Sequence, residues 1–125
     1  MTEELSKDRF EQVVAQGKDV VLSRCVQLVL EMAENIRDHL SRRQSHGKPA
    51  FQHETVMSEM GEAMAKVSLA LAQGPETQAY AHTELTKAAA QLSKLMGGHG
   101  YVTGALADKE YWVRMLGLWA NEVQP

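Results

Sequence analysis

The sequence has little cysteine, little proline and no excess of positive charge. Its 125 residues include 1 cysteine and 3 prolines, so no disulfide can form within the chain and few positions oblige a helix to stop. We expect the thiol of Cys25 to be a small buried hydrophobe rather than a reactive group, because it lies within an apolar run. The formal net charge of −3 provides no broad basic field, which argues against nucleic-acid binding.

Long apolar runs are also missing. No stretch approaches the ~20 consecutive apolar residues that a membrane-spanning helix needs. The opening segment carries charges throughout, unlike the apolar centre of a signal peptide, and the scarcity of cysteine fits a reducing compartment. We therefore expect a cytoplasmic protein that binds no membrane.

The composition is that of an ordinary globular protein, with 44% hydrophobic and 23% charged residues. A chain of 125 residues has the commonest size for one domain, and no shift in composition marks a boundary. We expect residues 1–125 to form a single helical domain.

Apolar residues recur at three- and four-residue spacing, the pattern of helices that bury one face. The pattern predicts a long helix over residues 5–43, in which Gly17 marks a kink or a break into a separate short helix. Gly47 and Pro49 end it, and a second helix follows over about residues 52–73. A third helix contains residues 82–96, and the last begins near Leu106 or Asp108.

These helices favour an all-α fold, an antiparallel bundle of four main helices with an extra short helix at the N-terminus, and no strand ladder. Two stripes are expected in the core: Met57, Met60, Met64, Val67 and Leu71, and then His82, Leu85, Ala89, Leu92 and Met96. In the last helix, Tyr111, Met115, Leu118 and either tryptophan are expected to face inward. Trp112 and Trp119 share a face, which is either core or an oligomer interface.

The order and spacing of three segments are similar to the C-terminal helical bundle of flavin-dependent acyl-CoA dehydrogenases. These segments are LSRRQSHGKP at 40–49, MSEMGEAMAKVSLALA at 57–72 and LTKAAAQLSKLMGGHGYVTG at 85–104. The resemblance covers about residues 15–122. It implies a bundle that forms oligomers and completes a site for FAD and acyl-CoA on a larger flavin-dependent dehydrogenase subunit.

The resemblance also implies cofactor-binding positions in two loops. In the family, the first loop reaches the ADP part of FAD bound mainly by a neighbouring subunit, and the matching residues are Arg43, Ser45 and His46. A guanidinium grips a pyrophosphate bidentately and a hydroxyl adds a further bond, so the chemistry is suitable. At the second loop Gly97 and Gly98 match a glycine pair beside the cofactor, and Lys94 stands where the family has glutamine.

The candidate catalytic base is Glu122. Many family members place a glutamate, which removes the α proton of the acyl thioester, in a YEGT motif after the last helix. Glu122 falls within about one residue of the expected spacing from Gly98, although the motif itself is absent. A solvated charge near the chain end is the favoured interpretation of this residue.

The N-terminal helical domain and middle β domain of a complete dehydrogenase find no counterpart in this sequence, so we expect no acyl-CoA dehydrogenation by the chain alone. Two other hypotheses stay open. One is a non-redox enzyme that uses an interhelical cavity with His46, His99 and Glu122, and the other is a purely structural interaction protein. No Glu-x-x-His pair or Cys–His spacing occurs, and we expect no metal.

Overall fold

The structure is a computed structural model that describes residues 7–42, 44–45, 47–49, 53–73, 77–96 and 105–122. These residues form five helices and one short β ladder. The helices are α1 (Lys7–Val14), α2 (Lys18–Arg42), α3 (Glu54–Leu71), α4 (Gln78–Met96) and α6 (Ala105–Glu122). The predicted all-α fold is confirmed at the level of a helical bundle. None of the helices in the described part of the chain is long and apolar enough to cross a bilayer.

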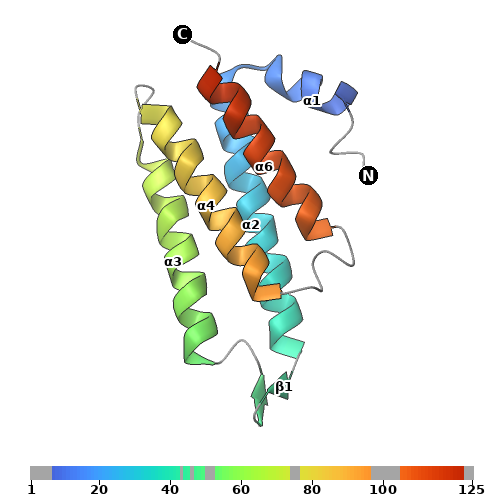
Figure 1. Ribbon diagram of the computed structural model, residues 1–125, viewed down its shortest axis with the longest axis vertical. Coiled ribbons are helices and arrows are strands. Elements are labelled where there is room, and N and C mark those ends of the chain that lie inside the picture. The colour runs from blue at the N-terminus through green and yellow to red at the C-terminus, as the bar shows by residue number, and fades with distance from the viewer. Residues whose placement is uncertain are drawn as a thin grey trace.

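Four helices form the antiparallel bundle and the fifth lies across one end of it (Figure 1). Helices α2 and α4 run in one direction, and α3 and α6 run in the other. Helix α4 packs on α2, α3 and α6. Helix α3 packs extensively on α4 but barely touches α2, which leaves that side of the bundle open.

The helix predicted over residues 5–43 is broken at Gly17 into two helices, which is one of the two outcomes, a kink or a break, that the sequence analysis expected. Its φ of 99° lies in a region that residues with a Cβ rarely adopt, so α1 ends there and α2 starts in a new direction. The amide of Val21 donates to the carbonyl of Gly17 at 3.0 Å and closes the first turn of α2. Gly17 thereby sets the angle at which α1 crosses the bundle.

The expectation that no strand ladder would occur is wrong at one place. Strands β1 (Gln44–Ser45) and β2 (Lys48–Pro49) pair antiparallel, with Gln44 opposite Pro49 and Ser45 opposite Lys48. Gly47, with a φ of 84°, reverses the chain between them. Two residues per strand are too few to show an alternating pattern in a sequence.

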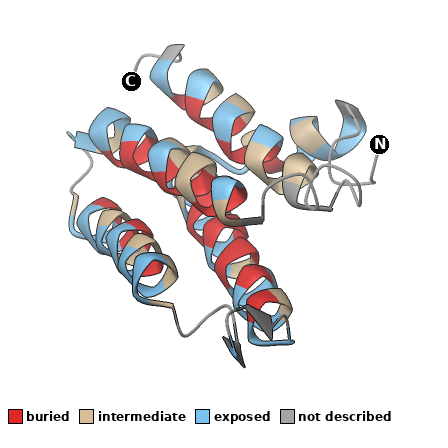
Figure 2. Ribbon diagram, turned by 60° about the horizontal axis from the view of Figure 1, so that its bottom comes forward, coloured by how far each residue is buried: buried red, intermediate tan, exposed pale blue. Residues whose placement is uncertain are grey.

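Helix α3 buries a different face from the predicted stripe. Met60 and Val67 are buried as expected and Met64 packs partly against the core, but Met57 and Leu71 are exposed. The buried positions instead include Ala63 and Ala70. Helix α4, on which α3 packs most extensively, also buries small residues, among them Ala81 and Ala88. Figure 2 shows the buried residues gathered where the helices face one another.

The stripe on α4 is confirmed for His82, Leu85, Ala89 and Leu92, which are all buried, and Met96 ends the helix. The orientation predicted for the last helix is correct for Trp112 and wrong for Tyr111 and Leu118. Tyr111 and Leu118 are exposed and Met115 is half-buried. The buried residues of α6 are Trp112, Val113, Leu116 and Ala120.

The question left open for the two tryptophans is answered by this orientation. Trp112 is only 2% exposed and belongs to the core, and Trp119 is partly buried against it. Phe10 of α1 meets Trp112 edge to face, with ring centroids 6.1 Å apart. Because burying the indole removes the largest apolar area on α6 from water, this residue turns the helix by about one position from the expected register.

Candidate functional site

Most of the loop residues singled out by the resemblance lie outside the described residues. These are Arg43, His46, Gly97 and Gly98, and His99 of the non-redox hypothesis lies outside them as well. Ser45 lies in β1, Lys94 is exposed in the last turn of α4, and Glu122 ends α6. The hypothesis of a non-redox site built from His46, His99 and Glu122 therefore depends on two residues that the structure does not describe.

The two ends of the bundle separate these positions (Figure 1). Helices α2 and α4 end on the same side, so the strand with Ser45 and the helical turn with Lys94 lie at one end. Glu122 lies at the opposite end, because α6 runs in the other direction for 18 residues, a length of about 27 Å. Glu122 cannot share a site with Ser45 and Lys94 within one chain.

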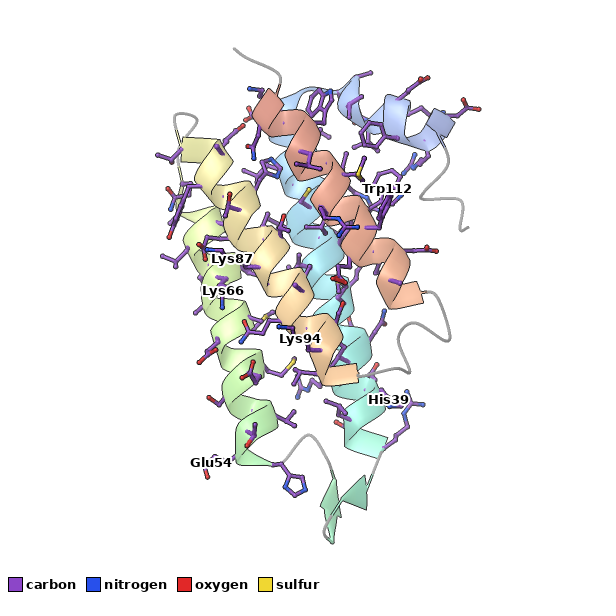
Figure 3. All side chains as sticks on the ribbon, viewed as in Figure 1. His39, Glu54, Lys66, Lys87, Lys94 and Trp112 are labelled. Atoms are coloured by element: carbon purple, nitrogen blue, oxygen red, sulfur yellow. The ribbon has the colours of Figure 1, made fainter. Side chains whose placement is uncertain are left out.

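Lys94 belongs to a groove between α3 and α4 that we call the lysine groove. It has a volume of about 560 Å³ and is lined by Glu59, Lys66, Lys87, Ala90, Gln91, Lys94 and Leu95. Lys87 and Lys94 are seven residues apart and share one face of α4, and Lys66 reaches the groove from α3 (Figure 3). Three ammonium groups and one carboxylate thus line one groove.

A hydrogen-bond network fixes the inner wall of the lysine groove. The ammonium of Lys66 donates to Oε1 of Gln91 at 2.8 Å. Nε2 of Gln91 donates to Oε2 of Glu59 at 2.7 Å and to Oε2 of Glu62 at 2.8 Å. These bonds join α3 to α4 and hold Lys66 in place, while its ammonium has further N–H donors for an anionic ligand.

Sequence reasoning selected Lys94 and missed its two lysine neighbours. The seven-residue spacing of Lys87 and Lys94 was a signal for a shared face. Lys66 gave no such signal, because only the packing of α3 on α4 brings it beside Gln91, which lies 25 residues further along the chain.

A second groove, the apolar groove, lies between α2 and α3 on the open side of the bundle. Its volume is about 610 Å³, and it is lined by Leu30, Ala33, Glu34, Arg37, Asp38, Met60, Gly61 and Met64. Leu30 is 45% exposed. A Cβ on Gly61 would meet nothing within 4 Å, so the backbone of α3 is open at this point. The groove combines an apolar floor with charges of both signs.

Neither cysteine nor metal chemistry adds to these grooves. Cys25 is fully buried as expected, and this burial raises the pKa of its thiol to about 12. Among the described residues, no three histidine, cysteine, aspartate or glutamate side chains gather in a way that would hold a metal ion.

Comparisons of the chain with protein-family models, with curated proteins and with solved structures find no match. The resemblance to acyl-CoA dehydrogenases therefore rests on the three sequence segments alone.

Proposed function

We propose that this chain is a helical binding subunit of the acyl-CoA dehydrogenase C-terminal type, which helps to hold the phosphates of FAD bound mainly by a larger flavin-dependent partner. One observation carries the proposal. Lys94, which the resemblance assigns to the cofactor, is one of three lysines around a single groove. Ammonium groups bind phosphate oxygens through charge-assisted hydrogen bonds, and the fixed Lys66 reduces the entropy lost on binding.

Within this proposal the chain supplies binding groups, and the partner supplies the flavin ring and the acyl-chain pocket. The described residues form helices and one two-residue ladder, without the β domain that positions the flavin in the family. The isolated chain should show no acyl-CoA turnover with added FAD and an artificial electron acceptor. Robust turnover by the isolated chain would contradict this expectation and would indicate that Glu122 acts as the catalytic base.

Replacing Arg43 with alanine should weaken binding of FAD or ADP by about 1.5–3 kcal/mol, the range for a hydrogen bond to a charged group. Lys94→Ala should weaken it in the same direction, because alanine removes both the charge and the hydrogen-bond donors. Calorimetric titration of FAD and ADP into the purified chain, with any partner that co-purifies, measures both effects. Lys109→Ala, on α6 and outside the groove, is the control.

Equal affinities for wild-type and variant chains, or no nucleotide binding by any of them, would contradict the cofactor role. Self-association without nucleotide binding would favour the purely structural interaction protein.

We also propose that a second copy of the chain covers the apolar groove. Leu30, Met64 and the neighbouring Met57 offer apolar surface, and Gly61 lets another helix approach closely. Glu34 and Asp38 line the groove together with Arg37. In a two-fold dimer the same patch meets itself, so opposite charges can face each other across the axis.

Leu30→Glu should dissociate the oligomer, because a buried unpaired carboxylate in the interface is strongly unfavourable. We expect the wild type to show at least twice 13.9 kDa at micromolar concentration by light scattering, and the variant to dissociate roughly tenfold or more readily. Leu69→Glu is the matched control, since Leu69 is 47% exposed on α3 but lies outside the groove. A 13.9 kDa wild-type species, or equal dissociation of both variants, would refute this interface.

A further inference from the structure

A third pocket lies between α4 and α6 and is separate from both grooves except at Lys87, which borders it and the lysine groove. Its volume is about 220 Å³. A cavity of about 150 Å³ accommodates benzene, so this pocket has room for one ring with a substituent. The residues that line it include His82, Thr86 and Lys87 from α4, and Arg114, Gly117 and Asn121 from α6.

His82 is the unusual member of this pocket. The residue is 1% exposed, and neither of its ring nitrogens has a hydrogen-bond partner among the described residues. Buried polar atoms in proteins are nearly always paired, so both ring nitrogens are available to a water molecule or a ligand that reaches the ring. A Cβ added to Gly117 would lie 3.6 Å from Nδ1, an ordinary van der Waals distance, so the glycine leaves room for about one carbon atom beside this buried nitrogen.

The charged groups around the pocket are cationic. Among the residues that the structure describes, its lining contains Arg114 and Lys87 and no carboxylate. The ammonium of Lys87 lies 3.9 Å from the carboxylate of Glu84, which offsets part of its charge. The guanidinium of Arg114 lies over the ring of Tyr111, 5.1 Å from its centroid, and this stacking leaves the N–H groups at its edge able to donate to an anion.

The polar groups further inside suit a neutral hydroxyl. The hydroxyl of Thr86 donates to the carbonyl of His82 at 2.9 Å, so its oxygen lone pairs can accept. Burial and then the charge of Lys18 lower the pKa of His82, which keeps the ring neutral near pH 7 with one donor and one acceptor. Anionic affinity therefore comes from Arg114 and Lys87, and His82 offers hydrogen bonding without charge.

We propose that the pocket between α4 and α6 binds a small ring-sized carboxylate that carries a hydroxyl group, with the carboxylate on Arg114 and the hydroxyl on His82. Asn121, about two turns further along α6 than Arg114, adds an amide to the lining. This site shares Lys87 with the lysine groove, but Arg114, Gly117 and His82 do not line that groove, so variants at Arg114 and Gly117 test the pocket separately from the flavin proposal.

The test uses 4-hydroxybenzoate as the probe and follows the ring resonances of His82 by NMR. We expect a saturable shift at probe concentrations up to about 20 mM, a range suited to so small a ligand. The neutral isostere 4-hydroxybenzamide should bind roughly tenfold more weakly. Inorganic phosphate that shifts His82 as strongly as the probe would overturn the carboxylate assignment and leave only a general anion surface.

Two variants separate binding from folding. Arg114→Gln should weaken the probe roughly tenfold to hundredfold, and Arg42→Gln, on exposed surface of α2, should leave it unchanged. Gly117→Ala should fold normally, because its Cβ would make only ordinary contacts at 3.5 and 3.6 Å, yet weaken the probe by filling space beside His82. Absence of a His82 shift in the wild type, or unchanged binding in both pocket variants, would refute the site.

Discussion

Replacing Trp112 with alanine is expected to lower the free energy of unfolding by about 3–5 kcal/mol, the usual cost of truncating a buried aromatic side chain. The indole is 2% exposed and packs against Phe10, so the variant loses contacts within α6 and between α6 and α1. The cavity left behind adds to the lost transfer free energy, because close-packed helices collapse only partly around it. Urea unfolding followed by circular dichroism measures the change.

The control for Trp112→Ala is Leu118→Ala, on an exposed position of the same helix. We expect that substitution to change stability by no more than about 0.5 kcal/mol in the monomer. A loss below about 1 kcal/mol for Trp112→Ala would contradict the core assignment and support the interface interpretation that the sequence also allowed.

Sequence periodicity predicted the helices well where large apolar side chains form the buried face. On α4, Leu85 and Leu92 carry the packing, and their four- and three-residue steps identified the face correctly. The break at Gly17 was also foreseeable, since glycine weakens a helix interior and tolerates positive φ.

Periodicity failed on α3 and α6 for related reasons. On α3 the buried face contains Ala63 and Ala70, whose small side chains were not included in the predicted core. The prediction instead followed the larger methionines and leucines, some of which lie on an adjacent, exposed face. On α6 apolar residues occur nearly all round the helix, so several faces were equally acceptable. The choice between them depends on Phe10, which no local pattern relates to Trp112.

The candidate sites were less accessible to sequence reasoning than the fold. The resemblance pointed to Lys94, but the groove around it needs Lys66 and Gln91, which meet only through the packing of α3 on α4. His82 was placed correctly in the core, whereas its unpaired nitrogens and the open space at Gly117 arise from the approach of α6. Interactions between distant segments thus define each site.

The two grooves and the third pocket lie between different pairs of helices. The apolar groove uses α2 and α3, the lysine groove uses α3 and α4, and the third pocket uses α4 and α6. Helix α3 thus lines both the groove proposed for self-association and the groove proposed for nucleotide binding. Leu30→Glu should therefore leave nucleotide affinity per chain unchanged unless the cofactor is shared between two copies.

The thiol of Cys25 should react with alkylating reagents at least about a thousandfold more slowly in the native protein than in the unfolded chain. Burial raises its pKa from the ordinary value of 9.0 to about 12, and the positive charge of Arg24 offsets only part of this rise. Because the thiolate is the reactive form, a rise of this size removes nearly all of it at pH 8, and the core also excludes the reagent. Native labelling should then follow the rate of global opening.

Mass spectrometry of iodoacetamide labelling at pH 8, with and without urea, measures this difference, and Leu69→Cys in a Cys25→Ala background is the exposed control.

The raised pKa of the Cys25 thiol also makes the free energy of unfolding depend on pH. Below pH 9 the thiol is protonated in both the folded and the unfolded state, whereas above pH 9 it ionises in the unfolded chain first. The free energy of unfolding should therefore fall by up to about 1.4 kcal/mol per pH unit. This fall should end where the folded thiol also ionises, near its pKa of about 12. Cys25→Ala should lose this component of the alkaline fall. Native labelling within about tenfold of the unfolded rate would mean that the bundle opens locally around α2 far more often than it unfolds.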